Sequence, residues 1–130
     1  MLWLEQTTVS GISNSAADYP WWLDVETGNS WESGSDGLAH NAADLEGMVS
    51  ALHAFGDVST VGIYSTSYQW GVIVGSNDGQ GVLAGLPDWI PGARRETSAS
   101  SNCSLPSFTN GSVLITQWFG HFDGDVSCQG

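Results

Sequence analysis

The strongest constraint on the fold is one amphipathic helix placed between two short apolar runs. Residues 41–55 carry apolar side chains at three- and four-residue steps, which form one helical stripe. The stripe consists of Leu45, Met48, Val49, Leu52 and Phe55. Asn41 can cap the start of this helix, and Gly56 is placed to end it. The runs at 21–26 and 58–64 are aromatic or β-branched and are bounded by breakers, which is typical of strands. A strand, a helix and a strand in this order form a βαβ unit, so we expect parallel strands.

Two more strands are predicted further along the chain, at 86–90 and 112–119. Before the first of them we expect a short helix at 66–74 and a glycine-rich loop at 76–85, and between the two a partly helical crossover at 94–109. About four parallel strands with helices fit the α/β class, as an open sheet or as part of a (β/α)8 barrel. A complete TIM-type barrel needs at least about 200 residues. A chain of 130 residues therefore has room for part of a barrel only.

The predicted domain follows an irregular N-terminal segment. Residues 1–20 show no helical or strand period, whereas residues 21–130 carry every predicted element. Residues 1–10 lack the positive region of a signal peptide, so the signal of an exported protein would lie upstream of this sequence. No apolar run reaches the eighteen or so residues that cross a bilayer.

Charge narrows the class of partner. The formal net charge is -12, there is no lysine, and Arg94 and Arg95 are the only strongly basic side chains. Such a surface repels phosphate backbones and anionic lipid headgroups, so we expect neither nucleic acid nor a membrane as partner. A hydrophobic content of 41% with seven tryptophans argues against a disordered chain.

Two cysteines, Cys103 and Cys128, lie in the last third of the chain. A disulfide between them would stabilise the fold by about 3–4 kcal/mol through loop closure. Two buried free thiols are the alternative. An oxidising compartment follows only from the disulfide.

The chemistry of the chain is predicted to centre on two acids at the end of the first strand. Side chains alternate faces along a strand, so Asp24 and Glu26 share one face with Trp22, and Leu23 and Val25 share the other. The carboxyl end of a parallel strand is where sites form in barrels and open α/β sheets. Two neighbouring carboxylates push their pKa values apart, which leaves one protonated and one ionised, as glycoside hydrolysis requires.

Other interpretations of the acid pair stay open. Two solvated acids at a strand end, or a divalent cation site, would have the same pattern. His40, His53 and His121 show no metal-ligand spacing, although His121 could join a site with the nearby aspartates. No phosphate loop or nucleotide motif is present, so we expect no cofactor and no resident metal.

Four segments occur in an order that resembles a known family. They are WWLDVETGNSW at 21–31, VGIYSTSYQWGVIVG at 61–75, LPDWIPGA at 86–93 and SVLITQWFGHFDGDVSC at 112–128. Together they resemble the second half of the glycoside hydrolase family 25 barrel (Chalaropsis-type lysozymes), and are closest to its secreted actinobacterial members. The resemblance implies the C-terminal half of a (β/α)8 barrel in an extracellular protein.

The resemblance also implies roles for individual residues. Asp24-Val25-Glu26 matches the Asp-x-Glu of the family, with Glu26 as the general acid and Asp24 assisting. The Gly-x-Tyr-Ser strand of the family places Tyr64 in the sugar cleft. The matching positions of the later strands and the closing aspartate motif are Trp89, Gln117 and Asp125.

Aromatic and polar residues near the acids complete the predicted sugar site. We expect Trp31 and Asn29 to contact sugar, and Trp70 to pack in the core. One departure from the family concerns its aspartate at the end of the first barrel strand, for which this sequence has no matching segment.

The resulting hypothesis is a lysozyme-like domain that hydrolyses β-1,4 amino-sugar linkages of peptidoglycan. The missing aspartate leaves activity an open question. A non-catalytic glycan-binding module is the first alternative. The second is a truncated product, or an incomplete barrel that needs a partner chain, because open sheet edges favour self-association.

Overall fold

The computed structural model describes residues 15–77 and 81–128. The predicted irregular start up to residue 14, part of the predicted glycine-rich loop and the last two residues lie outside these ranges. The described chain forms a five-stranded sheet in the order β1-β2-β3-β4-β5. Its strands are β1 Trp21–Asp24, β2 Val61–Tyr64, β3 Asp88–Ala93, β4 Val113–Trp118 and β5 Gly124–Ser127.

The α/β class and the four parallel strands are confirmed. Strands β1 to β4 pair in parallel, each beside its neighbour in sequence. The fifth strand, β5, lies antiparallel to β4 and was not predicted, since the tail 120–130 carries few apolar residues. It forms because the chain reverses after β4 and pairs with its open edge.

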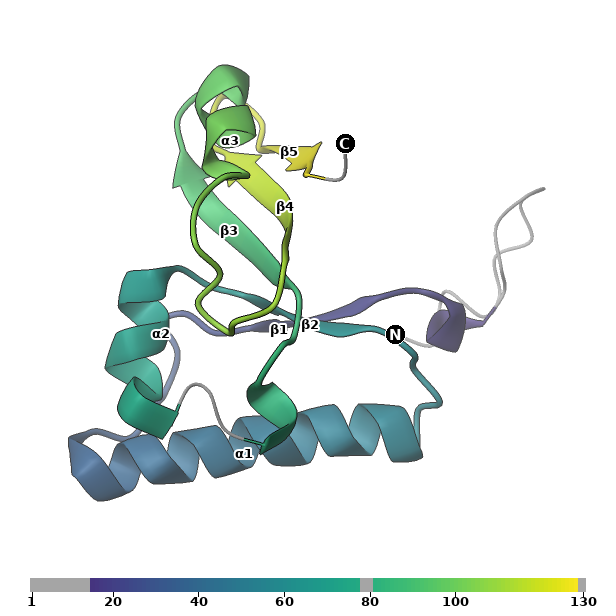
Figure 1. Cartoon of the computed structure of the whole chain (residues 1–130), viewed down its shortest axis with the longest axis vertical. Helices are drawn as coiled ribbons and strands as arrows, with labels where there is room; N and C mark the ends of the chain where they lie inside the picture. Colours follow the sequence, from purple (N-terminus) through teal and green to yellow (C-terminus); the bar gives the residue numbers. More distant parts are fainter. Residues whose placement is uncertain (1–14, 78–80, 129–130) are drawn as a thin grey trace.

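Three helices join the strands: α1 Gly34–Ala54, α2 Ser67–Ile73 and α3 Glu96–Asn102. Short 3-10 turns occur at η2 Ala16–Asp18, η3 Gly75–Asn77 and η4 Gly81–Leu83. In Figure 1, α1 runs along the base of the molecule beside β1 and β2, and β3 and β4 rise away from it toward α3 and β5. The sheet is therefore strongly twisted. The predicted helix at 66–74 is confirmed as α2, with Thr66 as its cap through a hydrogen bond from Gln69 N.

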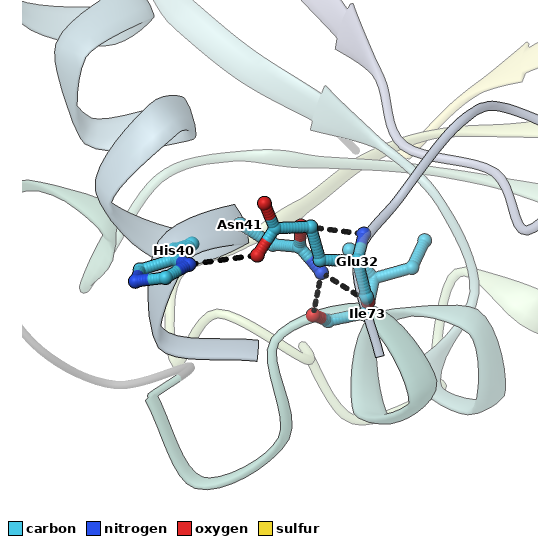
Figure 2. Close-up of polar contacts among 4 residues, drawn as sticks. All are labelled: Glu32, His40, Asn41 and Ile73. Carbon is cyan, nitrogen blue, oxygen red and sulfur yellow. Dashed lines mark hydrogen bonds and ion pairs between the residues drawn. The ribbon is translucent and has the colours of Figure 1, made fainter. Parts of the chain in front are cut away.

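The predicted start of the long helix is wrong. Helix α1 begins at Gly34 after the cap residue Ser33, about two turns before Asn41. Asn41 is buried inside the helix and binds the backbone of a neighbouring loop instead (Figure 2). Its Nδ2 donates to Glu32 O and Ile73 O, both at 2.9 Å, and its Oδ1 accepts from Glu32 N at 3.1 Å. The amide satisfies three backbone groups and so holds α1, the loop before it and the end of α2 together.

The predicted apolar stripe of α1 is confirmed in part. Leu45 and Val49 are buried, and Leu52 packs against the core. Met48 and Phe55 are 43% and 91% exposed, so the buried part of the predicted stripe does not include them. Leu45 and Val49 mark the face of α1 that points to the core. Met48 lies beside this face, and Phe55 follows the last turn of the helix.

The core lies between the sheet and the helices α1 and α2. Its strand residues are Val25, Val61 and Ile63, which are almost fully buried. Trp70 of α2 is 1% exposed and stacks at a tilt on Phe108, with ring centroids 5.4 Å apart. Trp70 therefore packs in the core, as predicted.

Helix α3 is tied to the last two strands by the predicted disulfide. Cys103 at the end of α3 bonds to Cys128 after β5, with an S–S distance of 2.05 Å and a Cα–Cα distance of 5.3 Å. Thr116 Oγ1 of β4 also donates to Ala99 O of α3 at 2.6 Å. The free-thiol alternative is wrong. Across the described ranges, no helix is both long and apolar enough to cross a membrane.

Candidate functional site

The carboxyl end of β1 places the two predicted acids on the face away from the core. The ladder continues one residue past β1, because Val25 N donates to Tyr64 O at 2.9 Å. Val25 is fully buried in the core, so alternation directs Asp24 and Glu26 to the opposite face. Asp24 is exposed and Glu26 is half-buried. The predicted division of faces is therefore confirmed.

The turn after β1 is held by the side chains of Asn29 and Trp31. Asn29 Nδ2 donates to Asp24 O at 3.3 Å, and Trp31 Nε1 donates to Glu26 O at 2.9 Å. Thr27 N donates to Gln69 Oε1 of α2 at 2.8 Å. The polar groups of Asn29 and Trp31 thus position the backbone of the acid pair, while their predicted contact with sugar stays a prediction. Gln69 also positions this turn, and sequence reasoning missed it.

Tyr64 and Gln117 meet across the sheet on this same face. Tyr64 OH donates to Gln117 Oε1 at 2.7 Å, although the two residues lie on β2 and β4. Trp89 of β3, between them, contacts Tyr64 edge to face with ring centroids 5.2 Å apart. Its Nε1 donates to Asp125 Oδ1 at 2.9 Å. The structure therefore brings all four of these predicted substrate-binding residues together.

Trp22 completes an aromatic floor made of Trp22, Tyr64 and Trp89. The rings of Trp22 and Trp89 meet at 79° with centroids 5.6 Å apart. Trp22 lies over Gly62, where an added Cβ would come within 2.3 Å of the indole ring. Glycine at position 62 is thus required for the indole to lie flat over β2. The sequence placed Trp22 on the acid face, but only the structure shows its contact with Trp89.

Four carboxylates act electrostatically on the floor. The pKa of Tyr64 is raised to about 12, mainly by burial and further by Glu26, Asp24, Asp123 and Asp125. The phenol therefore stays protonated and remains a hydrogen-bond donor to Gln117. The pKa of Glu26 is also raised, first by burial and then by the charge of Asp24. Glu26 thus holds its proton to higher pH than an exposed glutamate does.

Among the residues that the structure describes, none of the groups that shift the pKa values of Glu26 and Tyr64 is basic. His40 lies elsewhere, on α1, where its Nδ1 is 2.7 Å from Glu32 Oε2 (Figure 2). Within 15–77 and 81–128, no group of three or more His, Cys, Asp or Glu side chains could hold a metal ion.

Two hollows adjoin the site. One of about 160 Å³ lies beside the acid turn and is lined by Asn29 and Trp31 together with Val72 of α2. Another of about 290 Å³ lies at the amino ends of the strands, with Trp22 and Ile115 among its lining residues. Of the floor residues, Trp22 lines the second hollow.

A third acid, Asp88, was missed by sequence reasoning. It begins β3, where it pairs with Ile63 of β2, one residue before the level of Tyr64 and Asp24, and it is fully buried. Its Oδ2 accepts from Phe108 N at 3.0 Å and its Oδ1 from Thr109 Oγ1 at 2.8 Å. Burial raises its pKa against the opposing effect of these hydrogen bonds. The sequence did contain a signal for this residue, because Asp88 is an acid within the apolar strand predicted at 86–90.

The fold and the site define an α/β domain with a carboxylate pair beside an aromatic floor, at the carboxyl ends of parallel strands. Comparison with known proteins found no matching family model, no matching curated protein and no matching solved structure. The resemblance to glycoside hydrolase family 25 thus stays a prediction that depends on the sequence motifs.

Proposed function

We propose that this chain is a glycoside hydrolase-like domain that hydrolyses β-1,4 amino-sugar linkages of bacterial peptidoglycan. One observation carries the proposal. Glu26 is half-buried beside Asp24 at the edge of an aromatic floor, and its pKa is raised with no basic group of the described residues among the causes. A carboxylic acid that keeps its proton next to one that is ionised is the pair that this chemistry uses.

In the proposed reaction Glu26 donates its proton to the glycosidic oxygen as the bond to the anomeric carbon breaks. Asp24, which is exposed, stabilises the positive charge that develops on the sugar ring. Water then bonds to the anomeric carbon and gives up a proton, which restores the protonated Glu26. The flat rings of Trp22 and Trp89 offer apolar surface to the C–H faces of the sugars. Tyr64, held by Gln117, presents a fixed phenol at the same place.

The proposal is tested by the release of reducing ends from purified peptidoglycan. Wild type is compared with Glu26→Gln and with Glu46→Gln, a control on α1 with the same chemical change. Release that is lost only in Glu26→Gln supports the proposal. An absence of release from wild type would overturn the standalone enzyme, and retained binding to insoluble peptidoglycan would then favour a glycan-binding module.

A second candidate, an incomplete barrel that is completed by another chain, is favoured by the bare face of the sheet. Parallel sheets are usually covered on both faces. Helices α1 and α2 cover the face of Val25, whereas on the other face of the described sheet Trp22, Trp89 and Ile115 stay partly exposed. Strand β1 also lies at an edge of the sheet.

Size-exclusion chromatography with light scattering separates the two candidates. Self-association, or a stable complex with a chain that supplies further strands, supports the incomplete barrel. A monomer that resists proteolysis would count against it. An extracellular location is part of the main proposal and is supported by the disulfide, since such bonds persist in oxidising compartments.

A further inference from the structure

We propose that the tip of the β4–β5 hairpin, residues 119–123, is a sugar-binding subsite in which Phe122 stacks on a pyranose ring. This inference rests on the proposed function and extends it. The subsite would take a neutral sugar unit next to the one bound at the aromatic floor. No sequence motif pointed to Phe122.

The hairpin is anchored at its base. Trp118 of β4 pairs with Gly124 of β5, and an added Cβ on Gly124 would lie 2.1 Å from the Trp118 ring. The backbone of the tip is also tied to the neighbouring strand, because Phe119 N donates to Ala93 O at 2.9 Å. The tip is therefore presented from a fixed position.

The aromatic side chains of the tip point into solvent. Phe122 is 81% exposed and Phe119 is 47% exposed. The rings of His121 and Phe122 meet at 79° with centroids 4.7 Å apart. An edge-to-face contact of this kind orients the phenyl ring and leaves apolar surface free for a ligand.

Single exposed apolar residues are common on protein surfaces, so the exposure of Phe122 alone does not indicate a binding site. The location of the hairpin tip is the second observation. Asp123 follows Phe122 directly, and its charge is one of those that raise the pKa of Tyr64. Asp125, two residues further, accepts the hydrogen bond from Trp89 Nε1. Phe122 thus belongs to the hairpin that contacts the aromatic floor through Asp125, and in the proposed subsite a chain of linked sugars extends from the floor to this hairpin.

The charge around the tip selects the class of ligand. Asp123 and Asp125 follow Phe122 in the sequence. Together with Asp24 and Glu26, they are the four carboxylates that raise the pKa of Tyr64. Anionic ligands are repelled by such a group. An uncharged N-acetylated sugar, with an apolar C–H face and neutral polar groups, fits both the phenyl ring and the surrounding field.

The test measures binding of a β-1,4-linked tetrasaccharide of N-acetylglucosamine by calorimetry, in the Glu26→Gln background so that no bond is cleaved. Phe122→Ala should weaken binding by roughly three- to tenfold, the size expected of one aromatic contact. Phe122→Trp should retain affinity. Phe55→Ala is the matched control, because Phe55 is 91% exposed at the far end of α1. It should leave affinity unchanged.

The outcomes separate this inference from the proposed function. If the parent protein binds the tetrasaccharide and Phe122→Ala binds equally well, the subsite is overturned and the proposed function stands. A loss of affinity in Phe55→Ala as large as in Phe122→Ala would also overturn it. If the parent binds neither the tetrasaccharide nor insoluble peptidoglycan, the proposed function and the subsite both fall.

Discussion

The two faces of the sheet hold acids in opposite environments, because Asp88 pairs with the core residue Ile63 whereas the acid pair faces away from the core. At the carboxyl ends of the strands, Asp24 and Glu26 lie side by side with one of them exposed and the other half-buried. At the amino end of β3, Asp88 is fully buried and bound by Phe108 N and Thr109 Oγ1. Burial raises the pKa of both Glu26 and Asp88. Only the acid pair is within reach of a ligand, whereas every oxygen of Asp88 is used by the fold.

The contrast teaches that a raised pKa alone does not mark a functional acid. Asp88 holds the loop at 107–111 against β3, and Thr109 Oγ1 of that loop also lies 2.5 Å from Leu86 O. Thr109 Oγ1 therefore bridges the Asp88 carboxyl group and the backbone just before β3.

The largest expected effect is on the acid pair. Glu26→Gln should lower the release of reducing ends by at least a hundredfold, since a general acid contributes about 10²- to 10⁴-fold. Thermal unfolding of the variant should remain near that of wild type, because Glu26 has no ion-pair partner whose loss would destabilise the fold. A large fall in unfolding temperature would instead assign Glu26 a structural role and erase the contrast with Asp88.

Asp88→Ala should show the reverse pattern. It leaves Phe108 N without its acceptor in a buried place, which costs about 1–3 kcal/mol of unfolding free energy. Urea unfolding measures this loss, and glycan binding per folded molecule should be unchanged. Asp57→Ala is unsuitable as a control because Asp57 has a positive φ of 54°. Asp36→Ala on the exposed start of α1 is the better reference, with a change below about 0.5 kcal/mol.

The pH dependence of the unfolding free energy tests the contrast between Asp88 and the acid pair further. Because folding raises the pKa of Asp88, its contribution favours the folded state at acid pH. That contribution is lost as pH rises from the ordinary aspartate value of about 3.9 through the raised folded value. Asp88→Asn keeps a neutral donor and acceptor, so the variant should gain stability relative to wild type as pH rises. Parallel stability curves from pH 3 to 9 would contradict a raised pKa of Asp88 in the folded state.

The smallest expected effect is a shift in the pH profile of activity. Asp24 raises the pKa of Glu26 by charge, after burial. In Asp24→Asn this contribution disappears, so the alkaline limb of the activity profile should move to lower pH. The residual activity of Asp24→Asn, measured from pH 4 to 8, locates the alkaline limb of its profile. A limb that stays in place would mean that burial alone sets the proton affinity of Glu26.

Local sequence patterns predicted much of the site. Alternation along 21–26 assigned Asp24 and Glu26 to one face and Val25 to the core, because strand geometry needs only neighbouring residues. The short strand at 61–64 was found by its β-branched residues. The convergence of Tyr64, Gln117 and Asp125 was expected only from the family resemblance. Their contacts join distant parts of the chain, since Tyr64 and Gln117 are 53 positions apart and Trp89 and Asp125 are 36 apart. No local pattern encodes such contacts.

Sequence by itself determined the α/β class, the parallel order of the first four strands and the face that carries the acids, since periodicity and chain handedness decide these. It also identified the two cysteines that can bond. Tertiary structure decided the start of α1, where Asn41 is an internal clamp, and the pairing of β5 along β4. It alone separated Asp88 from the acid pair, because burial and hydrogen bonding depend on which distant residues surround a carboxylate.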